Sequence, residues 1–304
     1  MTIEELKKLH YEVKPCKEEE LELIENKLEE AESTCLTTAS WDSDQDRVLK
    51  ITDREGNLIA GIVAVIHGWG TAELDLLWVD ERYRGRGMAS ALIREAEAFF
   101  RESGCSLAVV DTFDFQARPL YEKHGYSLCG TVEDYPKGHC RYYLKKCLDS
   151  SDPDRTFSNA WRETGFKIQP GDGQDADLIF DGIMRYDVAK VQRPFEIEGE
   201  DGFYQLNKVI TGPEGKLIAG CYAAVTGWGN LFLGIWVEET FRNRGIGSCL
   251  LREVEREAKQ YGAYVALLDN VYDWQAEFLH KNGYRTSHRH EGGPRGRRLM
   301  QKEL

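Results

Sequence analysis

Apolar and polar positions follow one another in the same order twice along this chain. In each half a short alternating segment that ends in proline, at 11–15 and again at 166–170, predicts a strand leading into a helix. A hairpin, further apolar strands, a glycine-rich turn and a long amphipathic helix follow, and we expect that helix at 89–103 and at 247–261. The pattern therefore predicts a mixed α/β unit with its own core in each half.

The two halves also share sequence. Trp78 opens the stretch WVDERYRGRGMA, and Trp236 opens the stretch WVEETFRNRGIG 158 positions later (236 − 78). A repeat of that length is a domain rather than a solenoid unit. We therefore expect two related tandem domains, at 1–150 and 160–304, with a polar linker at 149–156.

Composition and charge narrow the range of functions. Of the 304 residues, 41% are hydrophobic and 30% are charged, which is ordinary for a globular protein. The net charge of −13 argues against nucleic acid as a partner and is compatible with a cationic small molecule. No apolar run reaches the roughly 18 residues of a membrane span, and we expect no membrane partner. The eight cysteines contain no C-x-x-C pair, so we expect reduced thiols, no metal site and a cytoplasmic location.

A glycine-rich turn between a strand and a helix is the motif that points to chemistry. The first copy, from Arg84 to Ala89, has the pattern R-x-x-G-x-A, and the second, from Arg242 to Gly247, has R-x-x-G-x-G. Such a turn exposes backbone N–H groups at a helix N-terminus, where these groups and the helix dipole bind phosphate. Glycine is needed because a Cβ would keep the phosphate at a distance. Recurrence in both halves separates this motif from an ordinary turn.

On these motifs both halves resemble the GNAT superfamily of acetyl-CoA-dependent N-acetyltransferases. The resemblance implies an α/β (mixed α+β) fold with a mixed central sheet flanked by helices, and acetyl-CoA or coenzyme A as the cofactor. In that family the glycine-rich loop binds the pyrophosphate, and the strand before it contacts the pantetheine arm. The coenzyme contacts implied here are Leu77, Trp78, Val79, Arg84, Gly85, Arg86, Gly87, Met88, Ala89 and Asp114, with Ile235, Trp236, Val237, Arg242, Asn243, Arg244, Gly245, Ile246 and Gly247 in the second half.

The family also has a helix with a tyrosine shortly before a Gly-Phe or Gly-Tyr pair. The first half matches it with QARPLYEKHGY, and the resemblance gives Tyr121 the role of the acid that protonates the leaving thiolate. The alternative is that Tyr121 only packs its helix. The second half has Leu279 at that position, while Asp114 and Asp273 stand where the family often has an asparagine.

The reaction also needs a base, because an ammonium with a pKa of about 10 must lose a proton before it attacks a thioester. Glu73 and Asp75, on the strand before the loop, are our candidates, and strand alternation places them on one face. The alternative is that both are edge charges facing solvent. His67, His124 and His139 are further candidate bases.

These observations predict an N-acetyltransferase that moves acetyl from acetyl-CoA directly to a primary amine of a small, cationic molecule. We expect catalysis in the first half, which has Tyr121 and the strand carboxylates, and a structural or coenzyme-binding role for the second half. The tandem is expected to form an intramolecular pseudo-dimer, compatible with a monomeric protein. The alternatives are a non-catalytic acetyl-CoA-binding sensor or scaffold, and a protein or peptide N-acetyltransferase.

Overall fold

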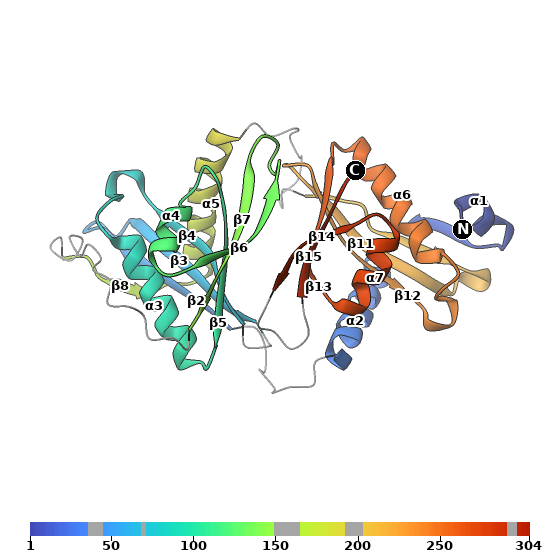
Figure 1. Cartoon of the computed structure of the whole chain (residues 1–304), viewed down its shortest axis with the longest axis horizontal. Coiled ribbons are helices and arrows are strands. Elements are labelled where there is room, and N and C mark those ends of the chain that lie inside the picture. The colour runs from blue at the N-terminus through green and yellow to red at the C-terminus, as the bar shows by residue number, and fades with distance from the viewer. Residues whose placement is uncertain (36–44, 68–70, 149–164, 192–202, 291–296) are drawn as a thin grey trace. The chain divides into compact units, whose positions relative to one another are not determined.

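The computed structural model describes residues 1–35, 45–67, 71–148, 165–191, 203–290 and 297–304. These residues form two compact units, which we call the Trp78 unit and the Trp236 unit after a tryptophan in each. Both units combine a mixed β-sheet with helices, as the sequence pattern predicts (Figure 1). Within the described ranges, no helix has the length and apolar character needed to cross a bilayer.

The Trp78 unit is built on a seven-stranded sheet in which, among the described ladders, only β4 and β5 run parallel. In spatial order its strands are β6 (Ser127–Glu133), β7 (Cys140–Cys147), β5 (Leu107–Phe113), β4 (Thr71–Val79), β3 (Leu58–His67), β2 (Gln45–Thr52) and β8 (Ile168–Pro170). Its helices are α3 (Met88–Glu102), α4 (Arg118–Lys123) and α5 (Gly173–Lys190).

The Trp236 unit repeats this arrangement with an eight-stranded sheet. Its strand order is β1 (Glu12–Pro15), β10 (Lys208–Thr211), β11 (Leu217–Thr226), β12 (Asn230–Val237), β13 (Val265–Val271), β15 (Arg297–Glu303) and β14 (Arg285–His290), with β9 (Phe203–Gln205) paired to β11. Its helices are α1 (Ile3–Lys8), α2 (Glu18–Cys35), α6 (Ile246–Gln260) and α7 (Asp273–Lys281).

The opening strand and helix of each half belong to the unit of the other half. β1 pairs with β10, and β8 pairs with β2, each in antiparallel register. In Figure 1 the blue helix α2 accordingly lies among the orange and red elements, and the yellow-green helix α5 lies among the green and blue ones. The compact units therefore differ in extent from the contiguous domains expected at 1–150 and 160–304, because each unit is assembled from separated segments of the chain.

The physical reason for this exchange is that the two sheets offer equivalent partner surfaces. Ile24 of α2 occupies the space that a Cβ on Gly220 would need, and Ile179 of α5 does the same at Gly61. Both isoleucines are fully buried. Because the two contacts are of the same kind, the sequence pattern does not determine which copy supplies each helix.

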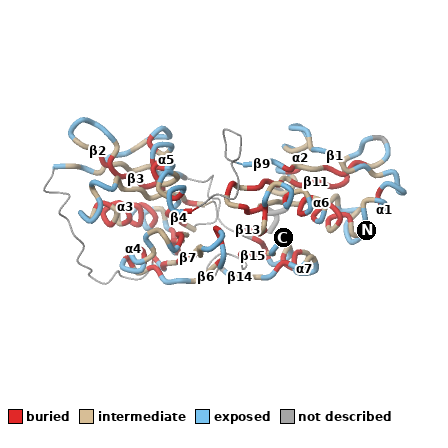
Figure 2. The backbone as a smooth tube through the Cα atoms, turned by 90° about the horizontal axis from the view of Figure 1, so that it is seen from above, coloured by how far each residue is buried: buried red, intermediate tan, exposed pale blue. Residues whose placement is uncertain are grey.

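Helices α3 and α5 cover opposite faces of the Trp78 sheet. Gly61 lies opposite Trp78 in the β3–β4 register, and α5 packs on this pair through Ile179 and Gly182. Successive strand residues face opposite sides, so Ile62 points to the other face, where α3 contributes to the core (Figure 2). The core on that face includes Ile62, Leu74, Leu92, Ile93 and Phe100.

Strand β4 contains a β-bulge at Asp75. Leu74 lies opposite Ala64, but the next paired residue of β4 is Leu76, opposite Val63, so Asp75 has no partner across the ladder. Because a bulge inserts one residue into a strand, it shifts the alternation of side chains beyond it and re-aims the inserted side chain. Core positions shift accordingly, from Leu74 before the bulge to Leu77 after it.

The equivalent strand of the other unit has no bulge. The β11–β12 ladder runs without a register shift from Val225 opposite Leu231 to Ala219 opposite Val237. The sequence agrees, since eight positions separate Gly70 from Trp78 but seven separate Gly229 from Trp236. The first half therefore holds one extra residue, and the fold places it on the strand that precedes the glycine-rich loop.

Candidate active site

The two central strands of each sheet separate before they reach the glycine-rich loop. The β4–β5 ladder ends with Glu73 opposite Val109, although β4 continues to Val79 and β5 to Phe113. The β12–β13 ladder ends in the same way, at Leu231 opposite Ala266. Backbone polar groups beyond these points have no partner in the ladder, so an extended ligand can pair with them.

The glycine-rich loops have the backbone geometry that the phosphate interpretation requires. Gly87 is the N-cap residue of α3 with φ of 90°, and Gly245 is the N-cap residue of α6 with φ of 80°. Only glycine adopts this left-handed region without strain. No side chain caps either helix, so the first backbone N–H groups are available to a phosphate. Gly85 has open space around its α-carbon, and the loop of the Trp78 unit therefore fits the pyrophosphate of a coenzyme.

The first arginine of each motif holds the end of the preceding strand. Nε of Arg84 donates to the carbonyl of Val79 at 2.9 Å, and Nε of Arg242 donates to the carbonyl of Val237 at 3.0 Å. Their contribution is thus partly structural, because they fix the strand end to the loop. Among the other predicted contacts, Met88, Ile246 and Gly247 are buried, whereas Arg86, Asn243 and Arg244 are exposed.

The loop of the Trp236 unit has a neighbour from the start of the chain. A Cβ on Gly245 would lie 3.2 Å from both the nitrogen and the Cβ of Met1. Nη2 of Arg252 donates to the carbonyl of Met1 at 2.6 Å. Met1 therefore occupies space beside the N-terminus of α6.

The two candidate bases on β4 differ in their surroundings. Oε2 of Glu73 lies 2.7 Å from Nε2 of His67, so this carboxylate is engaged. No residue in the described part of the chain donates a hydrogen bond to Asp75. The side chain of Asp75 reaches solvent, but the surrounding protein removes part of its hydration. This desolvation, and secondarily the negative charges of Glu73, Asp111 and Asp46, raises the pKa of Asp75 to about 6. Asp75 is the carboxylate whose pKa suits a base near neutral pH.

Tyr121 is held inside the Trp78 unit on helix α4. Its side chain is 7% exposed, and its ring meets Tyr126 edge to face at a centroid distance of 6.1 Å. Burial, and secondarily the charge of Asp111, raises the pKa of the Tyr121 phenol, so the hydroxyl keeps its proton at neutral pH. Asp111 acts electrostatically on both Asp75 and Tyr121, so the two predicted catalytic residues have one charged neighbour in common.

The remaining polar residues of this region pair with one another. Arg141 donates to both carboxylate oxygens of Asp111 at 2.8 and 2.9 Å. Asp114, predicted to contact the coenzyme, lies 2.9 Å from Nδ1 of His139 and accepts a hydrogen bond from the backbone of Cys140 at 3.2 Å. Two of the candidate histidine bases, at positions 67 and 139, are therefore partners of carboxylates.

Sequence reasoning missed two side chains at the end of α5, which lie beside the residues that precede Tyr121. Tyr186 and Asp187 contact Phe115 and Gln116, 71 positions earlier in each case. Their apolar neighbours at helical spacing predicted a helix, but only the exchange of segments brings that helix to this site.

The Trp236 unit has no acid–base pair in the same place within its described residues. Tyr222 lies opposite Gly234 in the ladder, and its ring fills the space that a Cβ on Gly234 would need. Leu231 and Leu233 stand on the strand where the other unit has carboxylates, and Leu279 is buried in the core. This unit therefore keeps the loop but not the candidate catalytic groups.

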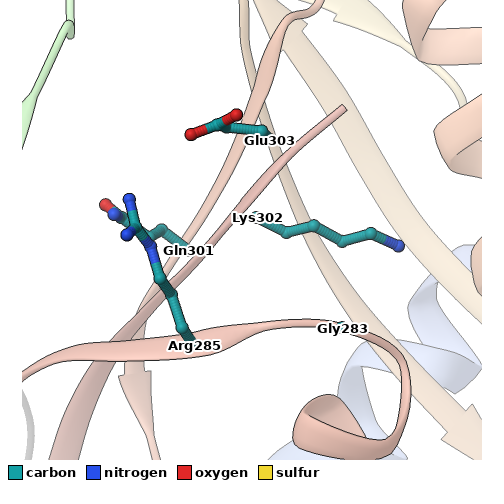
Figure 3. A pocket seen from close by; sticks show the side chains of 5 residues that line it. All are labelled: Gly283, Arg285, Gln301, Lys302 and Glu303. Atoms are coloured by element: carbon teal, nitrogen blue, oxygen red, sulfur yellow. The ribbon is translucent and has the colours of Figure 1, made fainter.

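A shallow depression of about 340 Å³ lies in the Trp236 unit, between β14 and β15 (Figure 3). Its lining residues are Gly283, Arg285, Gln301, Lys302 and Glu303. The guanidinium of Arg285 lies against the amide of Gln301, while Lys302 points away and donates to Glu255 at 2.6 Å. The depression belongs to the unit without Tyr121 and Asp75. Across the described residues, no cluster of histidine, cysteine and acidic side chains is arranged to hold a metal ion.

Comparisons with known proteins identify the family to which this chain belongs. The chain matches the family described as "Acetyltransferase (GNAT) family" over residues 6–126, and the one described as "Acetyltransferase (GNAT) domain" over residues 206–286. It is 44% identical over 94 residues to blasticidin-S acetyltransferase of Streptomyces morookaense, which covers 31% of this chain and 68% of that protein. It is 32% identical over 111 residues to an acetyltransferase of Agrobacterium fabrum, covering 36% of this chain and 80% of that protein.

A solved structure of an acetyltransferase from Bacillus cereus is 34% identical to this chain and superposes with a TM-score of 0.42. The match covers 44% of this chain and 95% of the Bacillus cereus chain. Two matched domains account for the duplicated strand, loop and helix, and for the paired glycine N-caps. The chain therefore belongs to the GNAT family of acetyltransferases as a tandem two-domain member, an enzyme that uses acetyl-CoA.

Proposed function

We propose that the Trp78 unit transfers acetyl from acetyl-CoA directly to a primary amine of a small, cationic molecule. The observation that carries this proposal is that Asp75 and Tyr121 have Asp111 as a common charged neighbour. One is a carboxylate with a pKa of about 6 and no hydrogen-bond donor among the described residues, and the other is a buried phenol in the same electrostatic neighbourhood.

Each residue has one step in the proposed mechanism. Asp75 takes a proton from the acceptor ammonium, which frees the nitrogen lone pair for attack. Acetyl-CoA supplies the thioester carbonyl at which the new C–N bond forms and the C–S bond breaks. As the C–S bond breaks, the amide nitrogen releases its second proton to solvent, and Tyr121 donates its phenolic proton to the departing sulfur. The proton held by Asp75 then returns to the phenolate through solvent, so that each turnover releases one proton. No nucleophilic side chain is needed, and holding the two reactants together supplies much of the rate.

The proposed coenzyme site runs along the separated part of β4 and onto α3. Backbone groups of Leu77, Trp78 and Val79 would pair with the pantetheine arm, and N–H groups from Gly85 to Ala89 would surround the pyrophosphate. Among the arginines, the exposed Arg86 would add charge at the loop; its guanidinium donates to the carbonyl of Arg82 at 3.2 Å and lies over the Tyr83 ring, 5.3 Å from its centroid.

Charge supports a cationic acceptor. Glu73, Asp111 and Asp46 all act on Asp75, and the chain carries a net charge of −13. Like charges gathered around an accessible group attract a cation. The relative from Streptomyces morookaense is named as an acetyltransferase of blasticidin S, which supports a small-molecule acceptor and makes that compound the first probe.

For the Trp236 unit we propose a role without turnover, structural or limited to coenzyme binding, because Leu279 takes the place of Tyr121, and Leu231 and Leu233 stand on the strand where the other unit has carboxylates. We further propose that the tandem acts as an intramolecular pseudo-dimer, which the exchange of opening segments supports.

A thiol-release assay with acetyl-CoA tests the proposed function. Acceptors would be blasticidin S, a polyamine, an aminoglycoside and a peptide with a free N-terminus, each given to the full chain. We expect transfer to a small cationic amine that Gly87→Glu abolishes and Gly245→Glu retains, because a side chain at the first loop collides with the phosphate. Transfer to the peptide alone would overturn the acceptor class, and the opposite loop dependence would move catalysis to the other unit.

A further inference from the structure

The last turn of α5 contacts two parts of the Trp78 unit that the proposed reaction uses. Oη of Tyr186 donates to the carbonyl of Phe115 at 3.1 Å, in the turn that leads to α4. The guanidinium of Arg84 lies over the Tyr186 ring, 4.8 Å from its centroid. Since Arg84 also holds Val79, the Tyr186 side chain connects the turn after β5 with the loop after β4.

The neighbouring Asp187 fixes the orientation of one side chain in that turn. Nε2 of Gln116 donates to both carboxylate oxygens of Asp187, at 2.9 and 2.8 Å. Oε1 of Gln116 accepts from the backbone of Phe113 at 3.0 Å and from the hydroxyl of Thr112 at 3.1 Å. The amide of Gln116 is thus engaged at both ends, and α4 with Tyr121 begins two residues later.

Asp187 is an unusual residue to keep for stability alone. It is 2% exposed, and within the described ranges Gln116 is the only hydrogen-bond donor to its carboxylate. Burial raises the pKa of Asp187 to about 6, because the hydrogen bond from Gln116 offsets only part of the lost hydration. A buried carboxylate without a cationic partner costs free energy, and an apolar residue of similar size is often as stable or more so. The residue therefore points to a role in function.

We propose that Tyr186 and Asp187 are positioning residues for acetyl transfer, which hold the turn before α4 so that Tyr121 stands beside the separated strands. This inference rests on the proposed function of Tyr121. Both residues come from the sequence of the second half, so that half completes the site of the first half even though its own unit lacks the catalytic groups.

Kinetics of full-chain variants test this proposal. Asp187→Ala and Tyr186→Phe remove the two contacts, and Asp181→Asn, exposed on the same helix, is the matched control. With acetyl-CoA and blasticidin S as probes, we expect kcat to fall about tenfold or more in Asp187→Ala, with KM for acetyl-CoA changed less than about threefold. The control should match the wild type.

Coupling to Tyr121 separates positioning from a general structural effect. Tyr121→Phe should cost less in the Asp187→Ala background than in the wild type, because a misplaced phenol has already lost its effect. If Tyr121→Phe lowered kcat by the same factor in both backgrounds, the two residues would act independently and the proposal would be overturned. An unchanged kcat in Asp187→Ala would also overturn it. Should Asp187→Ala fail to fold, Asp187→Asn and Tyr186→Phe, which preserve shape, carry the same comparison.

Fluorine NMR gives a readout that needs no acceptor. In protein labelled with 3-fluorotyrosine, the Tyr121 resonance is identified by its loss in Tyr121→Phe. We expect it to shift in Asp187→Ala and Tyr186→Phe, and to stay in place in Asp181→Asn. An unmoved resonance in the first two variants overturns the proposal. A shifted resonance in a protein that acetylates no amine would instead reject the proposed function and leave the positioning contact supported.

Discussion

The side chain of Ile179 fills the space that a Cβ on Gly61 would need, although the two residues come from different halves of the sequence. This contact places α5 on the sheet that carries Asp75, and so brings Tyr186 and Asp187 to the turn before Tyr121. The absence of a side chain at Gly61 therefore allows a helix from the second half of the sequence to pack on a sheet from the first half.

Gly61→Ala should lower the free energy of unfolding by about 1–3 kcal/mol, because Ile179 is fully buried and cannot move without disturbing its neighbours. Urea denaturation measures the effect. Gly173→Ala is the matched control, since open space surrounds that glycine, and its stability should be unchanged or slightly higher. Equal stability of Gly61→Ala and the wild type would contradict the close contact.

Asp75→Asn should reduce kcat/KM by about 100-fold or more, because the amide cannot take the proton of the acceptor. Glu73→Gln should reduce it less than about tenfold, since Glu73 already has His67 as a partner. Steady-state rates of both variants with a small amine acceptor show which of the two carboxylates is the base. The reverse order of effects would assign the base to Glu73.

The pH dependence follows from the raised pKa of Asp75. Because a base must be deprotonated to act, kcat/KM should rise with pH through about 6 and level off above it. Asp187 also has a pKa raised to about 6, so Asp187→Asn is the control, and the rise should persist in that variant. A profile whose rise disappears in Asp187→Asn would reject Asp75 as its source.

Tyr121→Phe should lower kcat about tenfold or more while coenzyme A binding, measured by calorimetry, stays within about threefold. The phenol is expected to act only as the thiolate leaves, so its loss affects turnover rather than binding. Tyr126→Phe is the control, because Tyr126 packs beside Tyr121 but is not expected to donate the proton. Unchanged turnover in Tyr121→Phe would leave that residue with a packing role.

The repeated strand, loop and helix could be predicted from the sequence because local chemistry decides them. Gly87 and Gly245 adopt positive φ where the phosphate interpretation requires glycine, and they are the N-cap residues of α3 and α6. Strand alternation beyond Asp75 could not be predicted, because a bulge is a property of two paired strands. The length difference between the halves, eight positions against seven, was its only trace in the sequence.

The sequence by itself determined that this chain is two copies of one α/β unit, each with a glycine-rich loop before a long helix, since spacing and glycine placement are local. Only the tertiary structure decided which copy receives each opening segment. Ile24 and Ile179 meet equivalent gaps at Gly220 and Gly61, so their apolar faces fit either sheet, and pairing across the chain settles the choice. That choice places Asp187 with Gln116, a contact between residues 71 positions apart.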